Sequence, residues 1–380
     1  YNNRIVSLHL PASLETIIST AFYPGPYLTT ITVDSNNRYF ESIDNVLFSK
    51  DRSKIVLYAP QNPNATYIVP NTVESIQANA FAGAKNLNHV ELPSSVRFIN
   101  NSAFEESALQ TISLNEGLLR ISNSAFTKTP LTSIFIPSTV EHIGSLCFAE
   151  CKSLVFFDVE PSNQFYKSVD QVLYDKNETK LINFPAPKNV VNYSVLNSVT
   201  DILDYAFFYS QYLRNVFLPS GLKTIDNSAF ADSNLNHINI PNSTQIIDLA
   251  AFSNSKLIEI LIPNNVEAIT MNTFHTCASL INVTLLEGIT SIDSYAFYRC
   301  SKLPSIVIPK SVKTISSSAF SKCTSLTSLT ISTGVTSIGS SAFSDCQALP
   351  TAFIPSNVKS LGSRCFEECY CTDRAINVKL

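Results

Sequence analysis

Apolar and polar residues alternate along this chain in a unit of 22 or 23 residues. The unit that begins at Leu131 reads Leu-Thr-Ser-Ile-Phe-Ile-Pro-Ser-Thr-Val-Glu-His-Ile-Gly-Ser-Leu-Cys-Phe-Ala-Glu-Cys. Its first, fourth and sixth residues are apolar, and this pattern is typical of a short β-strand with one buried face. The proline that follows lacks a backbone donor and ends the strand. Each unit therefore predicts one short strand and then a turn.

The second half of the unit predicts a return of the chain to the interior. Val140 and Ile143 face inward again, on an opposite wall. A small polar residue such as Asn101, Asn123 or Asn227 can cap a single helical turn that leads into an Ala-Phe pair. The phenylalanine is large enough to fill the centre of a coil and stack on its neighbours above and below. It recurs at Phe22, Phe81, Phe104, Phe126, Phe148, Phe207, Phe230, Phe252, Phe274, Phe297, Phe320, Phe343 and Phe366.

Two intervals between these phenylalanines are longer than the rest, at 59 residues each. Residues 43–58 and 169–184, one in each interval, consist of two β-rich runs around a polar turn, which is typical of a β-hairpin. The two segments lie 126 residues apart in the sequence. We infer an older tandem duplication of a block that contains one hairpin coil and several plain coils.

These repeats predict a β-rich α/β repeat solenoid that spans residues 1–380 as a single domain. A chain of 380 residues exceeds what one globular core supports, but each coil of a repeat array needs only its neighbours to bury its apolar face. We expect a long parallel sheet, short helical turns on the other wall and two β-hairpin insertions, in coils at about 34–66 and 160–192. The C-terminal end, 369–380, is irregular, which suggests a cap or the truncation of a longer array.

Composition argues against several classes of partner. Charged residues make up only 15% of the chain and the net charge is −4, so no basic field would attract nucleic acid. No run of 18 or more apolar residues occurs, and we expect no membrane insertion within this segment. The chain opens without a charged and apolar leader, so we interpret it as a mature or excised segment.

The cysteines occupy repeat positions. Six lie three residues after the repeat phenylalanine, and Cys147 and Cys365 take the alanine place before it. Because free cysteine often packs as a small hydrophobe, we interpret these eight as packing residues. Disulfides between adjacent coils or metal binding are the alternatives. Cys371 alone lies off both positions, and a bond from it to Cys369 or Cys365 stays open.

No arrangement of residues predicts catalysis. The five histidines show no metal-ligand spacing, and no calcium loop, phosphate-binding glycine loop or nucleophile elbow is present. An enzyme needs polar groups that converge in a pocket. We therefore expect no enzyme activity, no cofactor and no metal.

The unit I-P-x-x-V-x-x-I-G-x-x-A-F-x-x-C-x-x-L resembles the BspA-like (Treponema pallidum type) leucine-rich repeats of bacterial and protist surface proteins. The hairpins at Ile43–Ile55 and Val169–Leu181 are also similar to that family, and the resemblance covers roughly residues 5 to 369. It implies a leucine-rich-repeat horseshoe or superhelix that is secreted or held at the cell surface. It further implies cell adhesion through protein ligands, either on host cells or in the extracellular matrix.

Apolar side chains at outward strand positions are the candidate binding residues. Exposed aromatic side chains on a sheet are enriched at interfaces. We hypothesise that they form a protein-binding stripe on the concave face, although shielding by neighbours, a contact in a crystal or oligomer, or mere scatter would also explain them. A structural spacer without its own ligand is the alternative function, and a uniform Ser/Thr/Asn surface would favour it. The stripe consists of Phe135, Phe156, Phe217, Leu261, Val307 and Phe353, flanked by Thr111, Asn215, Asn239, Asn282 and Thr284.

Overall fold

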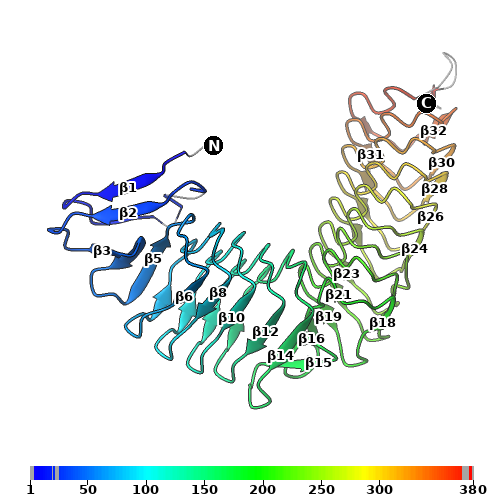
Figure 1. Ribbon diagram of the computed structural model, residues 1–380. Helices are drawn as coiled ribbons and strands as arrows, with labels where there is room; N and C mark the ends of the chain where they lie inside the picture. The colour runs from blue at the N-terminus through cyan, green and yellow to red at the C-terminus, as the bar shows by residue number, and fades with distance from the viewer. Residues whose placement is uncertain (1–3, 19, 22–24, 370–375, 379–380) are drawn as a thin grey trace. The chain divides into compact units, whose positions relative to one another are not determined.

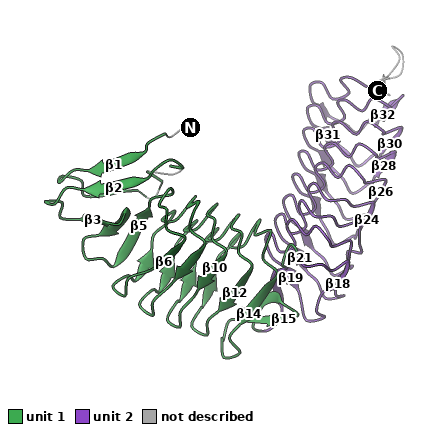
Figure 2. Ribbon diagram, in the orientation of Figure 1, with its two compact units in different colours: residues 1–176, 185–187 green, residues 177–184, 188–380 purple. Residues whose placement is uncertain are grey.

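The computed structural model describes residues 4–18, 20–21, 25–369 and 376–378. The chain forms two compact units, which Figure 2 colours separately. Unit 1 comprises residues 1–176 and 185–187, and unit 2 comprises residues 177–184 and 188–380. Each unit is a stack of coils in which short strands line two walls and a series of turns lines a third (Figure 1).

The first wall consists of the strands that the apolar pattern predicts. Their side chains alternate between buried and exposed, as in Glu259–Ile262 and Ser305–Ile308, because one face of each strand covers the interior. Neighbouring strands pair in parallel and in register, so that equivalent residues of successive coils lie side by side. In unit 1 these strands are β1 (Ser7–Leu10), β2 (Thr30–Val33), β6 (Thr66–Ile68), β8 (His89–Glu91), β10 (Thr111–Ser113), β12 (Ser133–Ile136) and β14 (Phe156–Val159). In unit 2 they are β18 (Asn192–Ser194), β20 (Asn215–Phe217), β22 (His237–Ile238), β24 (Glu259–Ile262), β26 (Asn282–Leu285), β28 (Ser305–Ile308), β30 (Ser328–Ile331), β32 (Ala352–Ile354) and β34 (Ile376–Val378).

The second wall consists of strands of two residues, each ending at the isoleucine or leucine of the V-x-x-I pair. These strands also pair in parallel from coil to coil. In unit 1 they are β7 (Ser75–Ile76), β9 (Phe98–Ile99), β11 (Arg120–Ile121) and β13 (His142–Ile143). In unit 2 they are β19 (Asp201–Ile202), β21 (Thr224–Ile225), β23 (Ile246–Ile247), β25 (Ala268–Ile269), β27 (Ser291–Ile292), β29 (Thr314–Ile315), β31 (Ser337–Ile338) and β33 (Ser360–Leu361).

An antiparallel hairpin over residues 46–58 occurs where the sequence predicts one, and a further hairpin that was not predicted precedes the predicted run in each hairpin coil. Strands β3 (Phe40–Ile43), β4 (Val46–Ser49) and β5 (Lys54–Tyr58) form an antiparallel meander, and β5 then joins the second wall beside β7. Strands β15 (Tyr166–Val169) and β16 (Val172–Asp175) repeat the first hairpin, and β17 (Lys180–Asn183) pairs with β19 in unit 2. Asp44 and Asn45 both have positive φ, the signature of a type I′ turn, whose twist matches that of the strands.

The prediction of a helical turn before each Ala-Phe pair is wrong. The described residues contain no helix, and the third wall is instead a run of tight turns. Residues two before and two after the phenylalanine, such as Ser102 and Glu106, have positive φ. A left-handed residue cannot continue a right-handed helix. The backbone also bonds differently, because the N–H of Phe81 donates to the carbonyl of Ala103 in the next coil at 2.7 Å rather than to a residue of its own coil.

The repeat phenylalanines form a continuous stack inside each unit. In unit 2, rings from Phe207 to Phe366 follow one another with centroids 4.7–5.5 Å apart and planes within 13° of parallel. In unit 1 the same stack runs from Phe81 to Phe148. In the hairpin coils, Tyr58 and Phe184 take the missing place and pack on Phe81 and Phe207. The predicted spine is confirmed for the described residues; Phe22 lies outside them.

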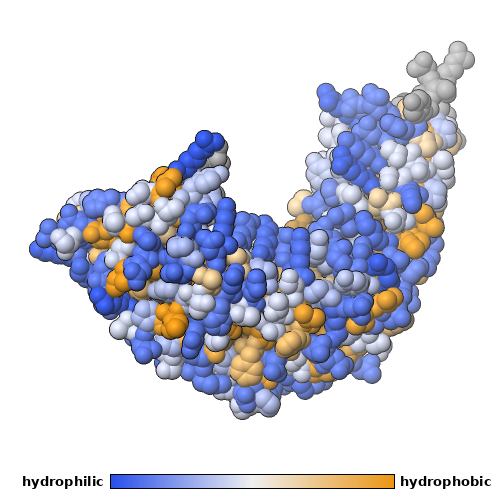
Figure 3. Space-filling model, in the orientation of Figure 1, coloured by the Kyte–Doolittle hydropathy of each residue, from blue (hydrophilic) through white to orange (hydrophobic). Residues whose placement is uncertain are grey.

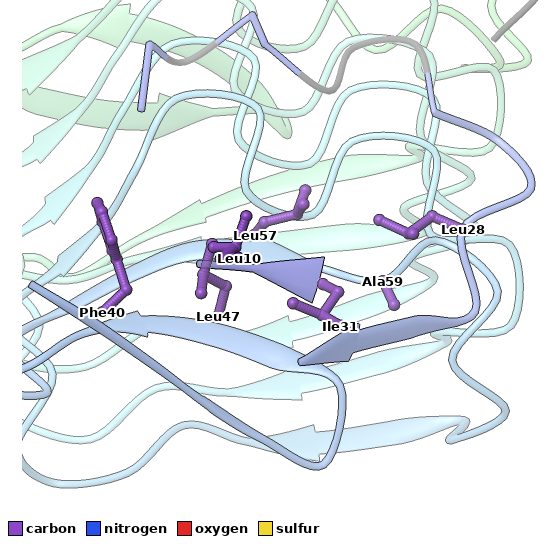
Figure 4. Close-up of a cluster of buried hydrophobic side chains, with 7 residues drawn as sticks. All are labelled: Leu10, Leu28, Ile31, Phe40, Leu47, Leu57 and Ala59. Carbon is purple, nitrogen blue, oxygen red and sulfur yellow. The ribbon is translucent and has the colours of Figure 1, made fainter. Parts of the chain in front are cut away.

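The N-terminal part of unit 1 has its own apolar cluster. Side chains from β1 to β5 and the adjoining turns meet there, and Figure 4 shows them pointing toward one another. The hairpin thus adds Phe40 and Leu47 to the interior. Burial of such side chains contributes roughly 1.5–3 kcal/mol each. The cluster consists of Leu10, Leu28, Ile31, Phe40, Leu47, Leu57 and Ala59.

Candidate binding surface

The predicted binding residues all project from the first wall. Their exposed fractions are 41% for Phe135, 40% for Phe156, 57% for Phe217, 47% for Leu261, 60% for Val307 and 63% for Phe353. The interior of each coil is already filled by the phenylalanine stack, so these side chains have no place inside. Figure 3 shows scattered hydrophobic patches on a mostly hydrophilic surface. Binding on a concave face stays a prediction.

In unit 1 the two candidate phenylalanines lie on neighbouring strands. Phe135 of β12 is opposite Asp158 of β14, and Phe156 is opposite Ser133. The two residues are therefore diagonal neighbours, and a strand spacing of about 4.8 Å with a rise of about 3.3 Å per residue places their Cα atoms about 8 Å apart. Together they form a small exposed aromatic patch.

In unit 2 the candidates occupy one position in alternate coils. Register pairs Leu261 with Thr284 and Val307 with Thr330, so each apolar side chain has an exposed polar one beside it. The sequence identified the apolar members but not this alternation, which became evident only once the register was known. We call this set the ladder; its members are Phe217, Asn239, Leu261, Thr284, Val307, Thr330 and Phe353.

A polar row runs beside the ladder, two residues earlier in each strand. The side-chain nitrogen of Asn215 donates to Oδ1 of Asn192 at 2.6 Å, and Nδ1 of His237 lies 4.0 Å from Oε1 of Glu259. Four of the five predicted flanking residues lie on this wall of unit 2; Thr111 lies in unit 1, where its hydroxyl is 2.7 Å from Nδ1 of His89.

Seven of the eight cysteines in the described part of the chain are buried and pack in the interior, and Cys369 is half-buried. Sγ of Cys277 donates to the carbonyl of Phe252 at 3.1 Å, and the same bond recurs at Cys300, Cys323 and Cys346. Burial raises the pKa of the Cys277 thiol to about 11, which suppresses the reactive thiolate. Cys365 and Cys369 are free, and Cys371 lies outside the described residues.

Titratable groups do not gather into a metal site. Within residues 4–18, 20–21, 25–369 and 376–378, no group of three or more His, Cys, Asp or Glu side chains is arranged to hold an ion. His142 has a lowered pKa because of burial and the nearby Arg120. In the same part of the chain, no helix is long and apolar enough to cross a bilayer.

One acidic residue was missed by sequence reasoning. Burial and the neighbouring carboxylate of Asp204 raise the pKa of Asp226 to about 6. Asp204 accepts a hydrogen bond from the backbone of Asn227, and Asp201 accepts one from the hydroxyl of Thr224. The carboxylates lie in successive coils, and only the register of the second wall brings them together.

Comparison with known sequences identifies the repeat. The profile of the BspA-type leucine-rich repeat region matches residues 1–62, 54–170, 183–270 and 245–373. The chain belongs to the BspA-type leucine-rich repeat family. This match confirms the resemblance to BspA-like leucine-rich repeats that the sequence analysis noted. Among curated proteins, none matches the chain in sequence.

Solved structures of other proteins, several of them described as leucine-rich, share the fold. A leucine-rich repeat protein from Eubacterium ventriosum superposes with a TM-score of 0.69 at 22% identity, covering 98% of this chain and 91% of its own. A leucine-rich cell surface protein from Faecalibacterium prausnitzii gives 0.58 at 24% identity, covering 86% and 79%. The pneumococcal vaccine antigen PcpA gives 0.51 at 19% identity, covering 87% and 90%.

Proposed function

We propose that this chain is a non-enzymatic, extracellular protein-binding module that acts in adhesion to host-cell or matrix proteins. The observation that carries the proposal is the exposure of Phe135, Phe156, Phe217, Leu261, Val307 and Phe353 on the first wall. Six large apolar side chains at 40–63% exposure cost free energy in water unless a partner covers them. Solenoid walls bind through area and a few anchor side chains.

The descriptions of two structural relatives support the proposed extracellular location. One structural relative is described as a cell surface protein and another as a vaccine antigen. Both descriptions are consistent with a location at the cell surface. A surface protein that carries exposed aromatic side chains is suited to holding a protein partner, because such side chains are enriched at interfaces.

The test is capture of the purified chain by immobilised matrix and host cell-surface proteins. The double variant Phe135→Asp/Phe217→Asp should lose capture, because a carboxylate cannot be desolvated against an apolar partner. The matched control, Phe98→Asp/Ile246→Asp, changes residues of 39% and 50% exposure on the second wall and should leave capture intact. Capture that is unchanged in the first variant would refute the binding stripe and favour a spacer role.

A further inference from the structure

Cysteines of unit 2 form a column along the stack of coils. Each lies three residues after a phenylalanine of the spine, and they recur at intervals of 23 residues. The phenylalanine rings of these coils stack with centroids 5.0–5.4 Å apart, so successive coils approach closely. We call this set the cysteine column; its members are Cys277, Cys300, Cys323, Cys346 and Cys369.

The last two members occupy equivalent places in neighbouring coils. Strands β31 and β33, which precede them, pair in parallel at an offset of 23 residues. The turns that follow keep this register, because the N–H of Asp345 donates to the carbonyl of Glu367 at 2.7 Å, the bond that a parallel pair makes when Asp345 is opposite Glu368. One residue further, Cys346 is opposite Cys369. Neighbouring strands lie about 4.8 Å apart, within the Cα separation of roughly 4.4–6.8 Å that a disulfide spans.

The sulfur of Cys369 is directed at the coil that contains Cys346. Sγ of Cys369 donates to the carbonyl oxygen of Phe343 at 3.1 Å, and Phe343 precedes Cys346 by three residues. The thiols of Cys346 and Cys369 are also in hydrogen-bonding contact with each other. Cys365 is placed differently, because the N–H of Phe343 bonds to its carbonyl and sets it opposite Ala342. The register therefore selects Cys346 as the neighbour of Cys369.

Cys369 is the accessible member of the column. It is half-buried, whereas Cys346 and the three preceding members are buried. The hydrogen bond from the Cys346 thiol lowers the pKa of Cys369, because it stabilises the thiolate. The same contact, together with burial, raises the pKa of Cys346. An accessible thiol beside a second, protected thiol is the arrangement in which the first reacts with an oxidant and the second resolves the product.

We propose that Cys346 and Cys369 form a reversible disulfide between neighbouring coils when a small-molecule disulfide oxidises them. The thiolate of Cys369 attacks one sulfur of the oxidant, which forms a mixed disulfide and releases one thiolate. Cys346 gives its proton to that thiolate and attacks the sulfur of Cys369, which releases the other half of the oxidant as a second thiolate. This thiolate takes up the proton that Cys369 lost. Two protein thiols are thus oxidised to one disulfide, and one small-molecule disulfide is reduced to two thiols.

The disulfide would fasten the two coils together at little cost to the interior. Cys346 gives up its hydrogen bond to the carbonyl of Phe320, but that carbonyl keeps the N–H of Cys323 at 3.3 Å. The bond closes a loop of 22 residues, which reduces the entropy of the unfolded chain. We therefore expect the oxidised protein to melt at a temperature several degrees higher than the reduced protein.

The experiment maps the bond in the full chain. Reduced protein, freed of reductant, is incubated with oxidised glutathione at pH 8, alkylated in denaturant and digested without reduction. Trypsin, Asp-N and Glu-C together place Cys346 in residues 345–359, apart from Cys323, and separate Cys369 from Cys365. We expect mass spectrometry to find residues 345–359 linked to the peptide that begins at Cys369, and reductant to release them. Cys371→Ala should give the same link.

The variant Cys346→Ala isolates the resolving step. Without its neighbour, Cys369 should remain as the mixed disulfide with glutathione, at a level at least tenfold above that in the wild type. Oxidation should then leave the melting temperature unchanged. The matched control Cys300→Ala removes a thiol from the same place in another coil, and it should form the bond as the wild type does. Circular dichroism of each reduced variant establishes that it is folded.

Three results would overturn the inference: a wild-type Cys369 that carries glutathione without linking to Cys346, a bond from Cys369 to Cys365 or Cys371, or equal levels of mixed disulfide in the wild type and Cys346→Ala. The thiol pair is separate from the predicted binding residues of the first wall. Capture of matrix proteins through Phe135 and Phe217 is therefore tested independently, and either proposal can fail while the other stands.

Discussion

The side chain of Asn163 donates a hydrogen bond from Nδ2 to the carbonyl oxygen of Pro137 in the preceding coil, at 2.7 Å. The same nitrogen donates to the carbonyl of Val140, and Oδ1 accepts from the backbone of Phe165 and Tyr166. Asn163 is fully buried, and Asn37, which is 126 residues earlier, makes the equivalent four bonds. One amide thus attaches each hairpin coil to the coil before it.

Replacing this amide should therefore destabilise unit 1. In Asn163→Ala, two backbone donors and two backbone acceptors lose a buried partner, and each unsatisfied group costs about 1–3 kcal/mol. We expect a loss of about 3–5 kcal/mol in the free energy of unfolding, measured by urea denaturation. The neighbouring substitution Ser162→Ala, at an exposed position, should change stability by less than about 0.5 kcal/mol. Equal stability of the two variants would contradict the role of Asn163.

Gly288 should be intolerant of a side chain. Its φ is 118°, and a Cβ would approach the oxygen of Asn264 to 2.0 Å, so Gly288→Ala must displace the backbone of the neighbouring coil. We expect a loss of more than about 2 kcal/mol. Gly221→Ala is the matched control, because nothing lies within 4 Å of its Cβ. Thermal melting of the two variants should differ by several degrees, and similar melting temperatures would show that the coils are not packed as closely as described.

Asp226 should make stability depend on pH. Its pKa is raised to about 6, so the folded state holds its proton more tightly than the unfolded state does. The associated stability is fully present below pH 4 and is lost as pH rises through 6. Asp226→Asn should therefore be more stable than the wild type by about 1–3 kcal/mol at pH 7.5 and equal to it near pH 3.5. Melting temperatures at the two pH values provide the measurement; a difference independent of pH would assign the effect to packing.

The buried cysteines should resist thiol reagents in the native state. Burial raises the pKa of Cys323 to about 12 and that of Cys277 to about 11. Iodoacetamide at pH 8 should leave both thiols unmodified for hours, and modification should be complete in 6 M guanidinium. Peptide mass spectrometry reads each site separately. The half-buried Cys369 provides the comparison within the same chain. Rapid native labelling of Cys323 would contradict its place in the interior.

The periodic features of the fold were predictable from the sequence because packing fixes them. Phe230 and its equivalents fill one volume that recurs in each coil, so both their identity and their spacing are constrained. The hairpin of β4 and β5 was predictable because two β-rich runs flank the polar residues 49–54. The turn at Asp44 and Asn45, which joins β3 to β4, was not predicted. The two parallel walls follow from the alternation of Leu, Ile and Val.

The conformation of the third wall, the run of tight turns, was not predictable because its residues are compatible with two conformations. Asn79 or Ser102 before Ala-Phe is equally compatible with a helix cap and with a left-handed turn residue, and glycine, which would have indicated the latter, is present only at Gly83 among the positions that flank the spine. Hydrogen bonds to the next coil favour the turn over the helix, and these bonds cannot be deduced from one coil's sequence.

The candidate site was predictable in part. The outward apolar residues could be read from strand alternation, whereas the spacing of Leu261 and Val307 along one line depends on register between coils. Asn163 could not be distinguished from Ser162 by type alone, because both are small polar residues in a turn. The proximity of Asp226 to Asp204 could not be predicted either, because it depends on the register between strands of the second wall.

The peptide dipoles of the third wall point the same way along each stack of coils. At Asn79, Phe81 and Gly83 the N–H groups all donate to carbonyls of the following coil, and the pattern recurs coil after coil. The peptide dipoles on this wall therefore add instead of cancelling, as they also do along an α-helix. Oxygen atoms face the beginning of the chain and hydrogen atoms face its end. Further coils can join such a stack only head to tail, and two like ends repel rather than pair.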